Sequence, residues 1–207
     1  MRRIVGMLLL LAGMGIVTFA VIQYVEHQAN LKEAMAEANE LIRKSEPIDA
    51  SNEQRADPVS YRDHVIDKSK FDPKLNDVIG MLQIPKLESE LPIIEGTDEE
   101  MLERGVGHYS GTAFPMDNEQ ILLSGHRDTV FRDFDKLSVG DRFIVKLPYG
   151  SFEYEIQSTD IVDKDDTSVI RSMGTEVLVI STCYPFRFVG NAPERYIFYA
   201  YPVGDHG

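Results

Sequence analysis

The only cysteine of this 207-residue chain is the side chain best suited to covalent chemistry. Cys183 ends an apolar, β-branched run that begins at Val177, and a loop containing Pro185 follows it directly. A residue at the end of a buried strand is held rigidly by the sheet yet stays accessible. A thiol in that position can act as a nucleophile when a nearby base or cation favours its thiolate form.

The chain contains five histidines, and one of them is expected to act as the general base for this thiol. His126 follows a short apolar run and a glycine, so its ring is held at a strand end, as Cys183 is. His108 lies in a turn flanked by glycines. The spacing favours His126 as the partner of Cys183 and leaves His108 as the alternative. The other three histidines fall outside the expected strands, and they are His27, His64 and His206.

Arg195 is the candidate donor for the negative charge that develops on an attacked carbonyl oxygen. It begins the last apolar run of the chain, directly after Pro193-Glu194, and shares a strand face with Ile197 and Tyr199. An arginine on an otherwise apolar face is costly to bury without a partner. An ion pair with Glu194 is the structural alternative to a role in catalysis.

Short strands must position these three residues. From residue 77 onward, apolar runs of four to eight residues alternate with turn signals, and only one short helix is expected. Residues 97–100 read as a capping box that opens this helix, which Gly105 ends. Pro92 places its strand at a sheet edge. The pattern predicts a mainly β domain over residues 77–207, folded as a closed or nearly closed barrel of about eight strands.

The N-terminus predicts a membrane anchor within residues 1–25. Residues 4–25 carry no charge, and 22 residues are enough for a helix to cross a hydrocarbon core of ~30 Å. Arg2 and Arg3 precede this segment, so the remainder of the chain is expected on the extracytoplasmic side of the cell membrane. A cleaved signal peptide is the alternative, but the apolar segment is long and lacks a small-x-small cleavage site.

Residues 26–76 are expected to form a helical and flexible extracytoplasmic stalk. Within residues 29–44, Leu31, Met35, Ala38 and Ile42 fall on one helical face. We interpret this segment as a spacer between membrane and domain, with a coiled-coil seam or a contact with the barrel as alternatives. Residues 45–60, which include Pro47 and Pro58, are expected to be extended or disordered.

The charge balance narrows the class of partner. The chain carries 34 acidic and 21 basic residues, a net charge of −13, which disfavours nucleic acid and anionic headgroups as ligands. No cofactor is expected. Four aspartates between residues 160 and 166 offer oxygen ligands for Ca²⁺, but their spacing is not that of an EF-hand, and acidic turns are usually solvated. These are Asp160, Asp163, Asp165 and Asp166.

Three segments, in their order along the chain, resemble the catalytic segments of the sortases, which are membrane-anchored cysteine transpeptidases of Gram-positive bacteria. The Tyr-Pro-Phe sequence after Cys183 and the segment at residues 107–113 are similar to the class D branch in particular. The usual Thr-Leu-x-Thr-Cys reads Val179-Ile180-Ser181-Thr182-Cys183 here, which removes the hydroxyl of its first threonine. The three segments are Leu123-Ser124-Gly125-His126-Arg127-Asp128-Thr129, Thr182-Cys183-Tyr184-Pro185-Phe186 and Ala192-Pro193-Glu194-Arg195-Tyr196.

The resemblance implies an eight-stranded sortase-type β-barrel and a role for each site residue. Cys183 would be the nucleophile that forms a thioester, His126 the general acid and base, and Arg195 the group that stabilises the oxyanion and the substrate. Thr182 and His108 would contact the substrate. The implied partners are secreted proteins with a Leu-Pro-x-Thr-like sorting signal and an amine of the peptidoglycan precursor or cross-link.

Two other classes of function stay open at this stage. A hydrolytic cysteine protease would use the same three residues with water as the acceptor. A non-catalytic, membrane-tethered β-domain would bind envelope proteins and leave Cys183 unreactive.

Overall fold

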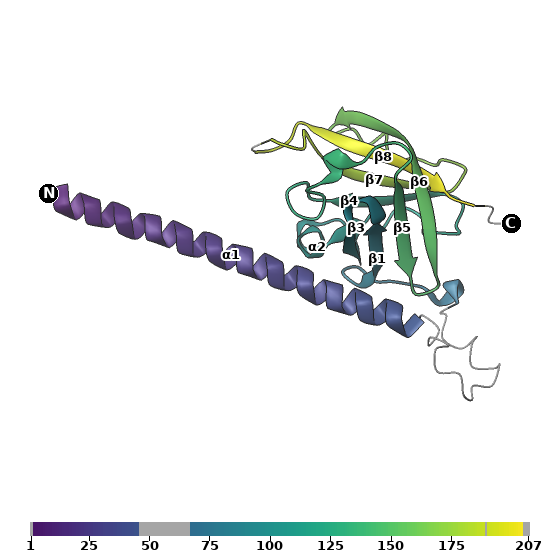
Figure 1. The fold of residues 1–207 in the computed structure, drawn as a ribbon, viewed down its shortest axis with the longest axis horizontal. Helices are drawn as coiled ribbons and strands as arrows, with labels where there is room; N and C mark the ends of the chain where they lie inside the picture. The colour runs from purple at the N-terminus through teal and green to yellow at the C-terminus, as the bar shows by residue number, and fades with distance from the viewer. Residues whose placement is uncertain (1, 46–66, 189, 205–207) are drawn as a thin grey trace.

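A long N-terminal helix and a β-barrel make up the protein (Figure 1). The computed structural model describes residues 2–45, 67–188 and 190–204. Helix α1, Arg2–Ser45, continues without interruption from the predicted anchor into the predicted stalk. Within the described residues it is the one helix that is long and apolar enough to cross a membrane, and none of its most apolar stretch is buried. Most of the predicted extended segment, residues 46–60, lies outside the described residues.

Eight strands close into a barrel, as the sequence predicts. Around the barrel their order is β1-β2-β3-β4-β7-β8-β6-β5. The pairs β2/β3 and β4/β7 are parallel, and the other neighbours are antiparallel. The strands are β1 Val78–Ile84, β2 Ser89–Glu95, β3 Val106–His108, β4 Gln120–Gly125, β5 Arg142–Leu147, β6 Gly150–Asp163, β7 Val177–Tyr184 and β8 Glu194–Pro202.

Among the described residues, four short helical turns accompany the strands, one before β1 and three between strands. They are α2 Glu99–Arg104 and the 3-10 helices η1 Lys68–Lys70, η2 Pro85–Leu87 and η3 Phe134–Lys136. Helix α2 ends at Gly105 as predicted, and the Gly105 N–H donates to the Met101 carbonyl at 3.1 Å. The predicted capping box is wrong, because Asp98 is the N-cap residue and its side chain makes no capping bond. The predicted edge position of Pro92 is also wrong for a closed barrel, although pairing with β3 starts only at Ile93.

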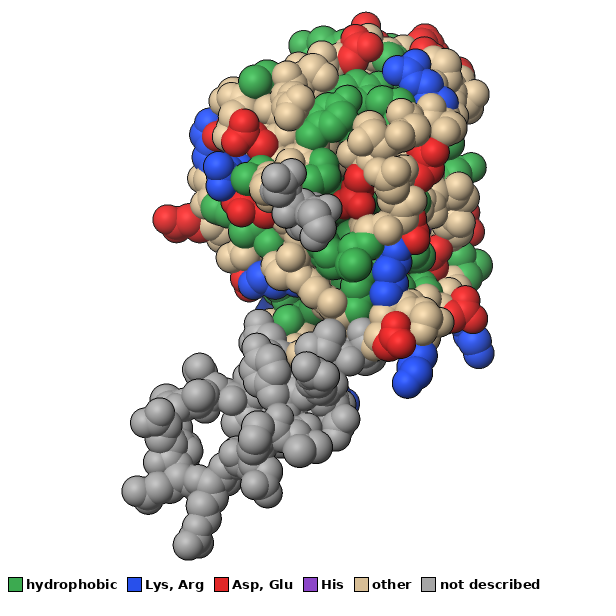
Figure 2. Space-filling view, turned by 90° about the vertical axis from the view of Figure 1, so that its right-hand side faces the viewer, with side chains coloured by type: hydrophobic (Ala, Val, Ile, Leu, Met, Phe, Trp, Pro, Cys, Tyr) green, Lys and Arg blue, Asp and Glu red, His purple; other side chains and the backbone are tan. Residues whose placement is uncertain are grey.

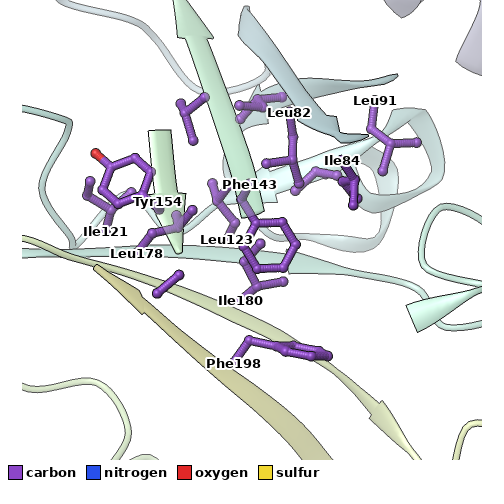
Figure 3. Packing of buried hydrophobic residues seen from close by; sticks show 14 of the residues in the cluster. Leu82, Ile84, Leu91, Ile121, Leu123, Phe143, Tyr154, Leu178, Ile180 and Phe198 are labelled. Carbon is purple, nitrogen blue, oxygen red and sulfur yellow. The ribbon is translucent and has the colours of Figure 1, made fainter. Parts of the chain in front are cut away.

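The core fills the barrel with side chains from alternate positions of each strand. Leu82, Phe143, Ile180 and Phe198 converge there from four different strands (Figure 3). The intervening positions of β4, β7 and β8 point outward and form a second apolar cluster. This outer cluster contains Leu122, Val177, Val179 and Ile197, and Val169, Ile170 and Met173 from the β6–β7 connection cover it.

The second half of α1 packs against the barrel. Ala34 and Ala38 are fully buried beside Met81 of β1 and Met101 of α2. Glu37 lies 3.7 Å from the guanidinium of Arg104. The interpretation of this segment as a free spacer is therefore wrong, and its apolar stripe is a contact with the barrel. Small alanine side chains permit the close approach of helix and sheet.

Candidate active site

The strand register brings Cys183, Arg195 and the end of β4 to one end of the barrel. Cys183 lies opposite Arg195 in the antiparallel pair β7/β8, and Thr182 lies beside Gly125 in the parallel pair β4/β7. Opposed residues of paired strands have Cα atoms ~5 Å apart. His126 directly follows Gly125, so the three predicted catalytic residues come from three adjacent strands.

Cys183 and Arg195 occupy the outer face of the sheet. Side chains alternate along a strand, and Cys183 has the same parity as Val177 and Val179 of the outer cluster. Arg195 has the same parity as Ile197. The apolar face that accompanies Arg195 in the sequence is thus the face covered by the β6–β7 connection, not the barrel interior. Cys183 is partly exposed, as an accessible nucleophile must be.

The Thr182 side chain is buried and bonds to the end of β4. Its side chain is 2 % exposed, and its hydroxyl donates a hydrogen bond of 2.9 Å to the Gly125 carbonyl. This burial speaks against a direct contact with substrate. The bond instead ties the residue before Cys183 to the residue before His126.

His126 contacts the first turn of α2. Its Nε2 atom lies 3.4 Å from Oε1 of Glu99, and 31 % of the histidine side chain is exposed. Glu99 is itself 76 % exposed, so this contact is screened by water. Sequence reasoning assigned no role to Glu99, because nothing in the local pattern shows that α2 lies beside the end of β4.

Arg195 is half-buried and donates from Nη1 to the backbone carbonyl of Glu194 at 3.2 Å. The contact is with the main chain of Glu194 rather than with its carboxylate, so the structure does not form the alternative ion pair. The remaining guanidinium N–H groups can donate to a substrate carbonyl.

Arg127 is a site residue that sequence reasoning missed. Its side chain is only 5 % exposed, although it carries a charge. Nη1 donates to the Pro185 carbonyl at 2.8 Å, and Nη2 donates to the Phe188 carbonyl at 3.0 Å. Arg127 therefore holds the loop that follows Cys183. Its position next to His126, in the segment that resembles the sortases, is the one sequence feature that could have indicated a role in the site.

His108 lies inside the protein, where it is 1 % exposed. Its Nδ1 lies 2.7 Å from Oε2 of Glu95, and its Nε2 lies 3.0 Å from the Ala113 carbonyl. The ring also stacks on Phe114 with centroids 4.3 Å apart. Both ring nitrogens are thus occupied, which argues against the predicted substrate contact. His108 instead fixes the segment that follows β3.

Two residues at the start of β4 hold the β6–β7 connection in place over the outer cluster. The Glu119 carboxylate accepts hydrogen bonds of 2.6 Å from the Ser172 hydroxyl and 2.6 Å from the Met173 N–H. These bonds, that from Ser172 above all, lower the pKa of Glu119 to about 2. The Gln120 amide donates to the Val169 carbonyl at 2.8 Å. The β6–β7 connection is therefore attached to the start of β4 by ionic and amide hydrogen bonds.

The aspartates considered for Ca²⁺ bond to their own turn. Asp163 accepts from the Asp165 N–H at 2.9 Å, and Asp166 accepts from the Ser168 N–H at 2.8 Å. In the described part of the chain, no group of three or more His, Cys, Asp or Glu side chains is arranged to hold a metal ion. That the protein needs no cofactor, with Ca²⁺ as the disfavoured alternative, stays a prediction.

Known proteins are similar to this chain in sequence and in fold. Residues 82–203 match the Sortase domain family. The chain is 42% identical over 200 residues to Sortase D of Bacillus subtilis strain 168, a match that covers 96% of this chain and 98% of that protein.

Solved structures of sortases are similar as well. A Clostridium perfringens Sortase D5 transpeptidase has a TM-score of 0.64 and 26% identity, covering 85% of this chain and 99% of the other. The catalytic domain of B. anthracis SrtD has a TM-score of 0.56 and 37% identity, covering 65% and 93%.

The eight-stranded barrel, the partly exposed cysteine at a strand end and these matches together define a cysteine enzyme built on a β scaffold. The chain belongs to the sortase family. It is a cysteine transpeptidase that acts by acyl transfer and is similar to the class D sortases.

Proposed function

We propose that this sortase is anchored in the cell membrane, cleaves a Leu-Pro-x-Thr-like sorting signal and transfers the protein to a peptidoglycan amine. One observation supports it most strongly. The only cysteine of the chain lies opposite Arg195 and next to the strand that leads to His126. A cysteine transpeptidase with one cysteine has one possible nucleophile.

Each of the three residues has a defined chemical step in this proposal. The Cys183 sulfur attacks the carbonyl carbon of the threonine in the signal, and Arg195 donates hydrogen bonds to the resulting oxyanion. His126 protonates the departing amine, which leaves a thioester. His126 then accepts a proton from the incoming amine, whose nitrogen attacks the thioester and releases the thiolate.

The proposed location rests on α1. Its first part is apolar and exposed on every side, which water does not favour and a bilayer does. Arg2 and Arg3 before it keep the N-terminus in the cytoplasm by the positive-inside rule. The barrel then lies outside the membrane, where secreted proteins and peptidoglycan precursors are found.

A peptide assay tests the proposal. The full chain in detergent should cleave a Leu-Pro-x-Thr-x peptide and, when an amine such as diaminopimelate is added, form the amide product. Cys183→Ala should abolish turnover, and His126→Ala should lower kcat by roughly 10²- to 10⁴-fold. Wild-type turnover by Cys183→Ala would refute the mechanism.

The same assay separates the two alternatives. Carboxylic acid as the sole product at saturating amine would indicate a hydrolytic protease. A thiol that does not react with an alkylating reagent at neutral pH, together with no cleavage, would indicate a non-catalytic binding domain.

A further inference from the structure

The barrel packs directly on the second half of α1. The helix runs through residues 26–30 without proline or glycine, the residues that most often kink a helix. Ala34 and Ala38 are fully buried against the barrel, and Leu31 packs on the main core. The position of the barrel along α1 therefore fixes its distance from whatever holds the apolar half of the helix.

That distance is short. An α-helix rises about 1.5 Å per residue, so Leu31 lies ~9 Å beyond Val25, the last residue of the apolar stretch. Gln28, already partly covered, lies only ~5 Å beyond it. The headgroup layer on each side of a bilayer is roughly 5–8 Å thick. The part of the barrel nearest Leu31 is thus at the outer boundary of the headgroups.

The catalytic end is the end that faces the apolar half of α1. In Figure 1, β8 runs toward the C-terminus, on the side away from the N-terminal part of α1. Because β7 is antiparallel to β8, it ends on the opposite side, toward the N-terminal part of α1. Helix α2 links the two regions, since Glu99 contacts His126 and Arg104 contacts Glu37 of α1.

The loop after β7 presents an aromatic and a cationic side chain at this end. Phe188 is 43 % exposed, and the Arg187 side chain is 89 % exposed. Arg127 holds the backbone of this loop from within, at Pro185 and Phe188, and the exposed Arg187 guanidinium lies 3.5 Å from the Asp135 carboxylate. Aromatic rings and arginines are favoured at the boundary between lipid and water. The face in Figure 2, which lies away from the N-terminus, carries acidic, basic and hydrophobic side chains interspersed.

We propose that the packed helix holds the catalytic end of the barrel against the outer headgroup layer, with Arg187 and Phe188 in contact with lipid headgroups. This inference rests on the proposed membrane anchoring of α1. The partly exposed Cys183 then lies at the end of the barrel that faces the membrane surface.

Tryptophan fluorescence tests the orientation, because the chain contains no tryptophan. Phe188→Trp places a single indole at the catalytic end. Met116→Trp is the matched control: Met116 is 64 % exposed and adjoins Glu176, before the start of β7, at the opposite end. Each full chain is reconstituted in phosphatidylcholine vesicles with or without a lipid that carries a nitroxide on its headgroup. The nitroxide should quench most of the Phe188→Trp emission and little of the Met116→Trp emission.

An insertion in α1 tests the role of the helix as a spacer of fixed length. Two helical turns, about seven residues and ~10 Å, are inserted after Gln28 so that the buried face keeps its direction. Quenching of Phe188→Trp should fall to the level of the Met116→Trp control, whereas cleavage of a soluble peptide should not change. Equal quenching of the two indoles without the insertion, or quenching that survives it, would overturn the orientation.

Flotation of the vesicles measures membrane association by itself, so a failure of the anchor can be told apart from a failure of the proposed orientation. Chains that do not float with the lipid would refute the membrane anchor of the proposed function. Chains that float but show no difference between the two indoles would refute only the orientation.

Discussion

Replacing Thr182 by valine removes one hydroxyl from the centre of the site and leaves the side-chain volume nearly unchanged. The hydroxyl is buried and donates to the Gly125 carbonyl at 2.9 Å. Loss of such a bond, with a buried acceptor left behind, costs about 1–2 kcal/mol of unfolding free energy. For a barrel of this size the melting temperature should fall by roughly 4–8 °C.

The effect on catalysis should be a loss of position rather than a loss of binding. Thr182 is bonded to the residue before His126 and directly precedes Cys183, so its hydroxyl sets the separation of thiol and imidazole. Small displacements of reacting groups lower rates strongly. We expect kcat for Leu-Pro-x-Thr-x cleavage to fall by about 10-fold or more, with little change in KM.

Thr182→Ser separates the hydroxyl from the methyl group. Serine keeps the donor and loses a buried methyl group, a change of about 1 kcal/mol. The two variants should therefore melt at similar temperatures, but only the valine variant should lose kcat. Thr175→Val, at an exposed position of the β6–β7 connection, serves as the neutral control. A rise in KM at unchanged kcat would show that Thr182 binds substrate directly. An equal loss of kcat in the serine variant would refute the role of the hydrogen bond.

Three further changes test other parts of the site. Gly125→Ala adds a Cβ that would meet a ring carbon of the buried Phe131 at 2.5 Å, and denaturant unfolding should show a loss of about 1–3 kcal/mol; an unchanged midpoint would contradict this packing. Because folding lowers the pKa of Glu119 to about 2, its ionised form stabilises the β6–β7 connection above the ordinary carboxyl range, and this stabilisation is lost as the pH falls toward 2. Glu119→Gln should therefore raise hydrogen exchange of that connection at pH 7, and an unaltered exchange rate would disprove the attachment. Glu99→Gln removes the carboxylate beside His126 and should lower kcat/KM by about 1.5- to 5-fold at low ionic strength, an effect that high salt should abolish.

The local sequence pattern is enough to predict the strands, and it also predicts where the strand that carries Cys183 ends. Alternation of apolar residues and the position of Pro185 are properties of a few consecutive residues. The register that places Gly125 beside Thr182 joins residues 57 positions apart, and no local signal contains it. The inward direction of Arg127 also depends on carbonyl groups of a distant loop.

The second half of α1 illustrates the same limit. The apolar stripe that contains Leu31 and Ala38 was visible in the sequence, but its partner was not. Met81 and Met101, which cover the stripe, lie in elements that come together only when the barrel closes. The choice between spacer and contact therefore required the tertiary structure. For Arg195, alternation along the sequence identifies the apolar face of the strand, but only the packing of the β6–β7 connection shows that this face is the outer one.

The intact mass of the protein after reaction with a Leu-Pro-x-Thr-x peptide tests the central claim most directly. In the absence of added amine, the wild-type chain should gain the mass of the peptide up to its threonine carbonyl, carried on Cys183. Addition of the amine should remove this mass, and Cys183→Ala should never acquire it. No adduct on the wild type, or an adduct that persists in Cys183→Ala, would contradict the account.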